Sequence, residues 1–122
     1  MEFRRRIIPT LLLRGSGLYK GRKFSNYRYI GDPINTVRIF NDKQVDELIL
    51  LDIDASHKKE FPNYSLLEEI SSECFAPLTY GGGINSIDQA KKIISIGFEK
   101  IVVNTNSWVN PFFVNLLVDT FG

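Results

Sequence analysis

The sequence predicts an α/β fold in which helices cover a parallel sheet. Short apolar segments recur along the chain, and each is followed by a polar or glycine-rich turn. Between them lie segments whose apolar residues recur at helical spacing, as in helices with one buried face. Four such strand–helix units follow one another, and regular alternation of strands and helices is typical of parallel βαβ crossovers.

Four apolar segments are the expected strands. The first contains Pro9, which cannot donate to a strand ladder, so we expect an edge position or an irregularity early in that strand. The second runs into two acids, Asp52 and Asp54, at its carboxyl end. The expected strands are Arg6 to Leu13, Val45 to Ile53, Ala76 to Tyr80 and Lys100 to Val103.

Four segments are the expected helices, and their ends carry capping residues. Asp32-Pro33 suits a helix start, and Ser86 with Gln89 three residues later forms a capping box. Gly97 is placed to end the third helix. The helices are predicted from Pro33 to Asn41-Asp42, Tyr64 to Cys74, Ser86 to Ile96 and Asn110-Pro111 to Thr120. Their inward residues are Ile34, Val37, Ile39, Phe40, Leu66, Leu67, Ile70, Cys74, Ile87, Ala90, Ile93 and Ile94.

The segment from Arg14 to Gly31 is long, punctuated by glycine, and mixes basic with aromatic residues. Cations interleaved with aromatic rings suit a nucleic-acid arm. The rest of the chain is close to neutral, however, which favours a loop over a ligand site, with room for a small hairpin.

Composition limits the function classes. The chain has 122 residues, 43% hydrophobic and 24% charged, with a net charge of +1, as in an ordinary globular domain. We therefore expect one domain, or part of one, over residues 1–122, in the cytosol, with no nucleic-acid partner and no membrane association. The single cysteine, Cys74, excludes an internal disulfide. With only one histidine, His57, the chain has almost no ligands for a zinc site. We expect no metal and no cofactor.

Three consecutive glycines, 81–83, separate the third expected strand from its helix. Glycine backbone can approach a ligand closely, and a helix N-terminus behind such a turn favours an anion, most often phosphate. A tight strand-to-helix turn without a ligand is an equally good interpretation. The anion site gains support from Val103-Asn104-Thr105, a second polar junction one strand later.

With these units laid out, the sequence resembles the N-terminal half of the cyclase subunit of imidazole glycerol phosphate synthase, a (βα)8 TIM barrel of histidine biosynthesis. The resemblance covers essentially the whole chain. It rests on Arg6-Ile7-Ile8 with Lys20-Gly21, Gly31-Asp32-Pro33, Asp46-Glu47-Leu48, Leu51-Asp52-Ile53 with Ala55-Ser56, Gly81-Gly82-Gly83-Ile84 and Val103-Asn104-Thr105. It implies a fold of four βα units that form half of a TIM barrel.

The resemblance also implies roles for individual residues. Gly83, Asn104 and Thr105 match part of the phosphate site, and Lys20 matches a lysine in a loop that covers the substrate. The other three residues, Arg6, Glu47 and Lys100, match a charged ring at the amino end of the barrel, beside the glutaminase docking surface and the ammonia entry. The implied partners are a glutamine amidotransferase and a phosphorylated small molecule. For any one of the three charges, an ordinary solvated surface residue is an equally good interpretation.

Two departures from the family pattern are evident. Leu12 stands where the family has a catalytic aspartate, so we assign no catalytic residue in this chain. A leucine at this position resembles paralogues associated with surface-polysaccharide biosynthesis. The chain is also shorter than the roughly 250 residues of a whole barrel. A half barrel leaves its first and fourth strands as open edges, so we expect either a fragment or a unit that pairs with its own copy.

Three functions remain open at this point. The first is a cyclase-type subunit that uses glutaminase-derived ammonia on a phosphorylated ribulosyl aminoimidazole precursor. The second is a non-cyclising paralogue that docks a glutaminase and supplies ammonia for sugar amidation. The third is an inactive phosphate-binding fragment.

Overall fold

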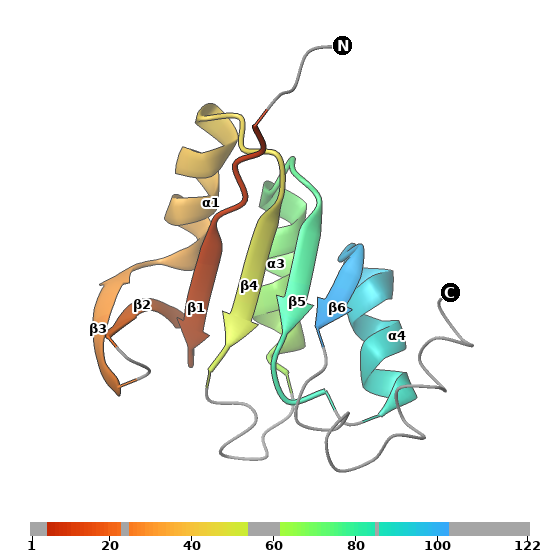
Figure 1. Cartoon of the computed structure of the whole chain (residues 1–122). Coiled ribbons are helices and arrows are strands. Elements are labelled where there is room, and N and C mark those ends of the chain that lie inside the picture. The colour runs from red at the N-terminus through yellow and green to blue at the C-terminus, as the bar shows by residue number, and fades with distance from the viewer. Residues whose placement is uncertain (1–4, 23–24, 54–61, 85, 103–122) are drawn as a thin grey trace.

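Four parallel strands form the centre of the computed structural model, which describes residues 5–22, 25–53, 62–84 and 86–102 (Figure 1). They are β1 (Thr10–Arg14), β4 (Leu48–Asp52), β5 (Leu78–Gly81) and β6 (Lys100–Val102). Two antiparallel strands, β2 (Gly17–Arg22) and β3 (Ser25–Gly31), extend the sheet beside β1. The order across the sheet is β3-β2-β1-β4-β5-β6. The predicted α/β class with a parallel centre is confirmed.

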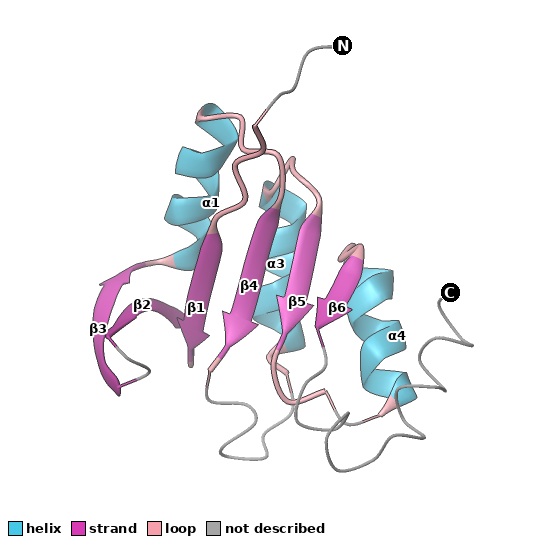
Figure 2. Ribbon diagram, viewed as in Figure 1, coloured by secondary structure: helices cyan, strands magenta, loops and turns pink. Residues whose placement is uncertain are grey.

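Three described helices lie on one face of this sheet (Figure 2). They are α1 (Pro33–Asp42), α3 (Tyr64–Glu73) and α4 (Ile87–Ile96). Each helix has an N-cap residue whose side chain accepts a hydrogen bond from a backbone N–H of the first turn. These residues are Asp32, Asn63 and Ser86. Gly97 ends α4 with φ +129°, in the region that favours glycine. No described helix has the length and apolar character needed to span a bilayer.

The hydrophobic core lies between the sheet and these helices. Alternate strand residues point to opposite faces, so Leu11, Leu50 and Tyr80 line up on the helix side. They belong to one buried cluster with Leu67 and Ile93 of the helices. The prediction that Ile39 points inward is wrong, since its side chain is 53% exposed. Ile39 follows the buried Val37 by only two positions, which turns it away from the inward face of the helix.

The structure corrects the expectations at the first strand. β1 begins at Thr10 rather than Arg6, and the Ile7 N–H donates to the Asp46 carboxylate at 2.7 Å instead of extending a strand. The segment after β1 forms the hairpin β2–β3 almost throughout, so it is mainly sheet rather than loop. That hairpin pairs with β1, so the prediction that the first strand is an open edge is wrong. The predicted fourth helix lies outside the described residues.

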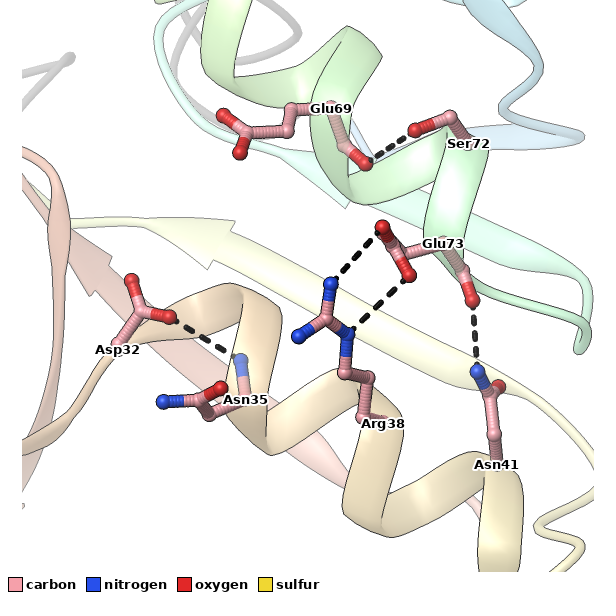
Figure 3. A network of polar contacts seen from close by, with 7 residues as sticks. All are labelled: Asp32, Asn35, Arg38, Asn41, Glu69, Ser72 and Glu73. Atoms are coloured by element: carbon pink, nitrogen blue, oxygen red, sulfur yellow. Dashed lines mark hydrogen bonds and ion pairs between the residues drawn. The ribbon is translucent and has the colours of Figure 1, made fainter.

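Helices α1 and α3 are joined by polar contacts at their carboxyl ends (Figure 3). Arg38 donates to both carboxylate oxygens of Glu73, at 3.3 and 3.1 Å, and this contact lowers the pKa of Glu73. Asn41 donates to the Glu73 carbonyl at 2.6 Å and accepts the Phe75 N–H at 3.0 Å. One side chain of α1 thus bonds the backbone on both sides of the α3 terminus.

We predict that Asn41→Ala lowers the free energy of unfolding by about 1 kcal/mol, since it removes both contacts with the α3 terminus. Urea denaturation measures the change. Asn35→Ala on the exposed face of the same helix is the control, because its backbone N–H bond to Asp32 survives the substitution. Equal losses in the two variants would contradict a specific role for Asn41.

Candidate functional site

The predicted site residues fall at the two opposite ends of the parallel strands. The arrows of β1, β4, β5 and β6 point the same way in Figure 1, so their carboxyl ends share one edge of the sheet. Gly83 lies at that edge, just beyond β5. Two of the predicted phosphate residues, Asn104 and Thr105, lie outside the described residues. The charged residues Arg6, Glu47 and Lys100 lie at the other edge.

A glycine turn leaves the carboxyl end of β5. Gly82 has φ +136° and Gly83 has φ +48°, both in the region that side chains disfavour. A Cβ on Gly82 would lie 2.6 Å from the Asp52 carbonyl oxygen and 2.8 Å from the Asp52 Cβ. Residue 82 must therefore lack a side chain, and the turn packs directly on the end of β4. Beyond it, Ser86 accepts the Gln89 N–H at 3.2 Å, as the capping box predicts.

Lys20 is an exposed residue of β2 in the hairpin, one position beyond the last residue that pairs with β1. The same strand carries Tyr19, which stands opposite Leu12 in the register. The Arg14 guanidinium lies 5.8 Å from the centre of the Tyr19 ring, within the range of a cation–π contact. Arg14, the last residue of β1, thus places one cation at the carboxyl end of that strand, packed on the hairpin. Sequence reasoning missed the Arg14–Tyr19 contact, because it depends on a hairpin register that was not predicted.

Leu12 lies on the face of the sheet away from the helices. The register sets it between Tyr19 of β2 and Leu51 of β4. Leu51 in turn stands opposite Gly81, where a Cβ would lie 2.7 Å from the Leu51 Cδ2 atom. The position that carries an acid in the family pattern therefore lies among apolar and aromatic neighbours.

Asp52 is a carboxylate that the structure brings to the carboxyl end of β4. The Tyr80 hydroxyl, on a fully buried side chain, lies 3.5 Å from the Asp52 Oδ2 atom. Burial, and secondly the charge of Asp52, raise the pKa of Tyr80 far above its ordinary value, so the phenol stays protonated. Sequence reasoning missed Tyr80 as a partner of Asp52. The available signal was a tyrosine in an apolar strand beside a strand that ends in an acid.

An ion pair bridges two strands at the amino end of the sheet. The Lys100 Nζ atom lies 3.3 Å from the Glu47 Oε1 atom, which links the start of β6 to the start of β4 past β5. Lys100 is exposed, whereas Glu47 is partly buried. Among the described residues, no ion pair joins Arg6 to either of them. The structure therefore brings two of the three predicted charges together.

Hydrogen bonds donated by backbone N–H groups hold this end of the sheet together. Ile7 and Asp46 exchange two bonds, because the Asp46 N–H also donates to the Ile7 carbonyl at 2.9 Å. The Leu48 N–H donates to the Pro77 carbonyl at 3.0 Å, and the Glu99 N–H donates to the Leu78 carbonyl at 2.8 Å. We call the surface formed by residues 6–8, 46–47, 75–77 and 99–100 the amino-end rim.

Metal ligands do not gather within the described ranges. No group of three or more histidine, cysteine, aspartate or glutamate side chains there could hold a metal ion.

Comparison with known proteins identifies relatives along nearly the whole chain. It is 52% identical over 119 residues to the "Putative imidazole glycerol phosphate synthase subunit hisF2" of Pseudomonas aeruginosa, covering 98% of this chain and 47% of that protein. It is 51% identical over 117 residues to a like-named HisF protein of Leptospira interrogans, covering 96% and 46%. It is 37% identical over 118 residues to the "Imidazole glycerol phosphate synthase subunit HisF" of Pyrococcus furiosus, covering 97% and 47%.

The chain spans about half the length of these relatives. A family profile described as "Histidine biosynthesis protein" matches residues 6–122. The observed order of strands and helices agrees with part of a TIM barrel, the fold of that family. By its sequence, the chain belongs to the histidine biosynthesis protein family and is similar to its HisF subunits.

Proposed function

We propose that the chain is part of a cyclase-type subunit of imidazole glycerol phosphate synthase. In this proposal, a glutamine amidotransferase releases ammonia at the amino ends of the strands. The ammonia then reaches a phosphorylated ribulosyl aminoimidazole precursor at the carboxyl ends, in the cytosol. The proposal draws support from membership of the family and from relatives whose names describe them as subunits of this synthase.

One observation carries the proposal: both ends of the same parallel strands hold suitable groups. At the carboxyl end, Gly82 and Gly83 form a turn with positive φ angles, and turns of this kind can present backbone N–H groups to an anion. Asn104 and Thr105 would add an amide and a hydroxyl, and Lys20 would help cover the bound substrate from the hairpin. At the amino end, the Glu47–Lys100 ion pair would border the path of ammonia into the sheet.

Leu12 favours a second candidate, a non-cyclising paralogue. Leucine cannot transfer a proton, and a general acid or base typically contributes a factor of about 10²–10⁴ to a rate. A subunit without that group could still dock an amidotransferase and pass ammonia to an enzyme that amidates a sugar for a surface polysaccharide. The apolar neighbours of Leu12, Tyr19 and Leu51, support this candidate because they offer no replacement acid beside it.

We predict that inorganic phosphate raises the melting temperature of the chain. A ligand that binds only the folded state stabilises it by about 2.7 kcal/mol at one hundred times its dissociation constant. Thr105→Ala should abolish most of the shift. Ser95→Ala is the matched control, since it removes an exposed hydroxyl from the far part of α4. An equal phosphate response in both variants would argue against the phosphate site.

We predict that Leu12→Asp, made in a full-length family protein that carries this segment, increases cyclisation with ammonium by about 10²–10⁴-fold. The partly buried position should raise the pKa of the new carboxyl group and suit it to proton transfer near neutral pH. Leu12→Asn is the control, because it has the same shape but cannot carry the proton. Equal cyclisation rates in the two variants would mean that a proton-transferring group at residue 12 does not restore the reaction. That result would support the ammonia-supplying role.

A further inference from the structure

Tyr80 combines a fully buried ring with a hydroxyl group that meets an acid of the neighbouring strand. Its side chain is 0% exposed, and its ring packs edge to face on Phe98 with 6.0 Å between the ring centres. A phenylalanine would fill the same space, whereas a buried hydroxyl needs a hydrogen-bond partner. The structure provides that partner in Asp52, whose Oδ2 atom lies 3.5 Å from the hydroxyl oxygen. The hydroxyl therefore serves the contact with Asp52 rather than the packing of the core.

This contact holds one oxygen of the Asp52 carboxylate on the helix side of the sheet. Asp52 ends β4, and alternation along the strand places it on the same side as the buried Leu50. Burial, and secondly the charge of Asp52, raise the pKa of Tyr80 far above its ordinary value, so the phenol donates its proton to the bond. Because the core fixes the Tyr80 ring, the position of the bonded carboxylate oxygen is fixed as well.

Asp52 also borders the glycine turn at the carboxyl end of β5. A Cβ on Gly82 would lie 2.8 Å from the Asp52 Cβ, so the turn contacts this residue directly. Gly82 and Gly83 have the positive φ angles of a turn that can present backbone N–H groups to an anion. A carboxylate directed at such a turn would repel the anion, and the repulsion grows as the distance shortens. Rotation about the Cα–Cβ bond of Asp52 decides how near its charge comes.

We propose that Tyr80 is a positioning residue for the anion site, whose hydroxyl holds the Asp52 carboxylate on the helix side, away from the glycine turn. This inference rests on the proposed function, in which the turn at Gly83 binds a phosphate group. The phosphate then meets the N–H groups of the turn without a negative charge directed at them. Residue 80 thereby sets the affinity of the turn for anions without touching the ligand.

The test measures the affinity of the chain for inorganic phosphate by titration calorimetry. Tyr80→Phe keeps the ring in the core but removes the hydroxyl, so the carboxylate can rotate toward the turn. This variant should bind phosphate about tenfold more weakly. Asp52→Asn, which removes the charge, should bind phosphate at least as tightly as the wild-type chain. In the Asp52→Asn background, Tyr80→Phe should cause no further loss, because no charge is left to be positioned.

Thr79→Val is the matched control. It removes a hydroxyl from a buried side chain of the same strand, but residue 79 points to the opposite face of the sheet from residue 80. Its phosphate affinity should equal that of the wild-type chain. The unfolding midpoint of each variant is recorded to show that the fold is intact.

The outcomes separate the positioning role from the proposed function. If the wild-type chain binds phosphate and Tyr80→Phe binds it equally well, the positioning role is wrong while the phosphate site stands. An equal loss from Tyr80→Phe with and without the charge of Asp52 would also overturn it, because the hydroxyl would then act through packing alone. Weaker phosphate binding by Asp52→Asn would show that Asp52 supports the anion instead of opposing it. If the wild-type chain binds no phosphate, both the site and the positioning role are wrong.

Discussion

Parallel pairing of β1, β4, β5 and β6 is the constraint on which both candidate sites depend. In a parallel sheet every strand starts at one edge and ends at the other, so residues far apart in the chain meet according to their position within a strand. The register sets Leu12, Leu51, Gly81 and Val102 side by side on the face away from the helices. A shift of one residue in any strand would turn its side chains to the other face.

Close packing fixes that register where β4 meets β5. Leu51 fills the space above Gly81, and the Asp52 backbone fills the space above Gly82, so larger residues could not pair there without moving the strands. On the helix side, Leu50 and Tyr80 pack in the same core cluster, and the Tyr80 ring meets Phe98 edge to face at 6.0 Å. The glycine turn at the carboxyl end is thus positioned by the core rather than by its own sequence alone.

Local signals made much of the fold predictable. Asp32 and Ser86 accept backbone N–H groups where the capping patterns predict them, and Gly97 ends its helix. The segment after β1 was predicted as a loop with room for only a small hairpin, because glycine-punctuated polar and aromatic sequence suits a ligand loop as well as a hairpin. Ile39 was misjudged because a run of apolar residues in a helix does not by itself fix where the inward face ends.

The sites were less predictable than the fold, because their contacts depend on register. Glu47 and Lys100 are 53 residues apart in the chain and meet only because their strands start at the same edge. The contact between Tyr80 and Asp52 depends on packing that no local pattern encodes. Resemblance to the family supplied the expected role of Glu47 and Lys100. It did not supply Tyr80 or Asn41.

Hydrogen exchange measured by mass spectrometry tests most directly whether the two ends of the sheet serve different ligands. The chain would be measured alone, with inorganic phosphate, and with the glutamine amidotransferase subunit. The account predicts that phosphate protects the glycine turn at residues 81–84, and that the subunit protects residues 46–48 and 75–77 on the amino-end rim. Protection of the same end by both ligands would contradict it.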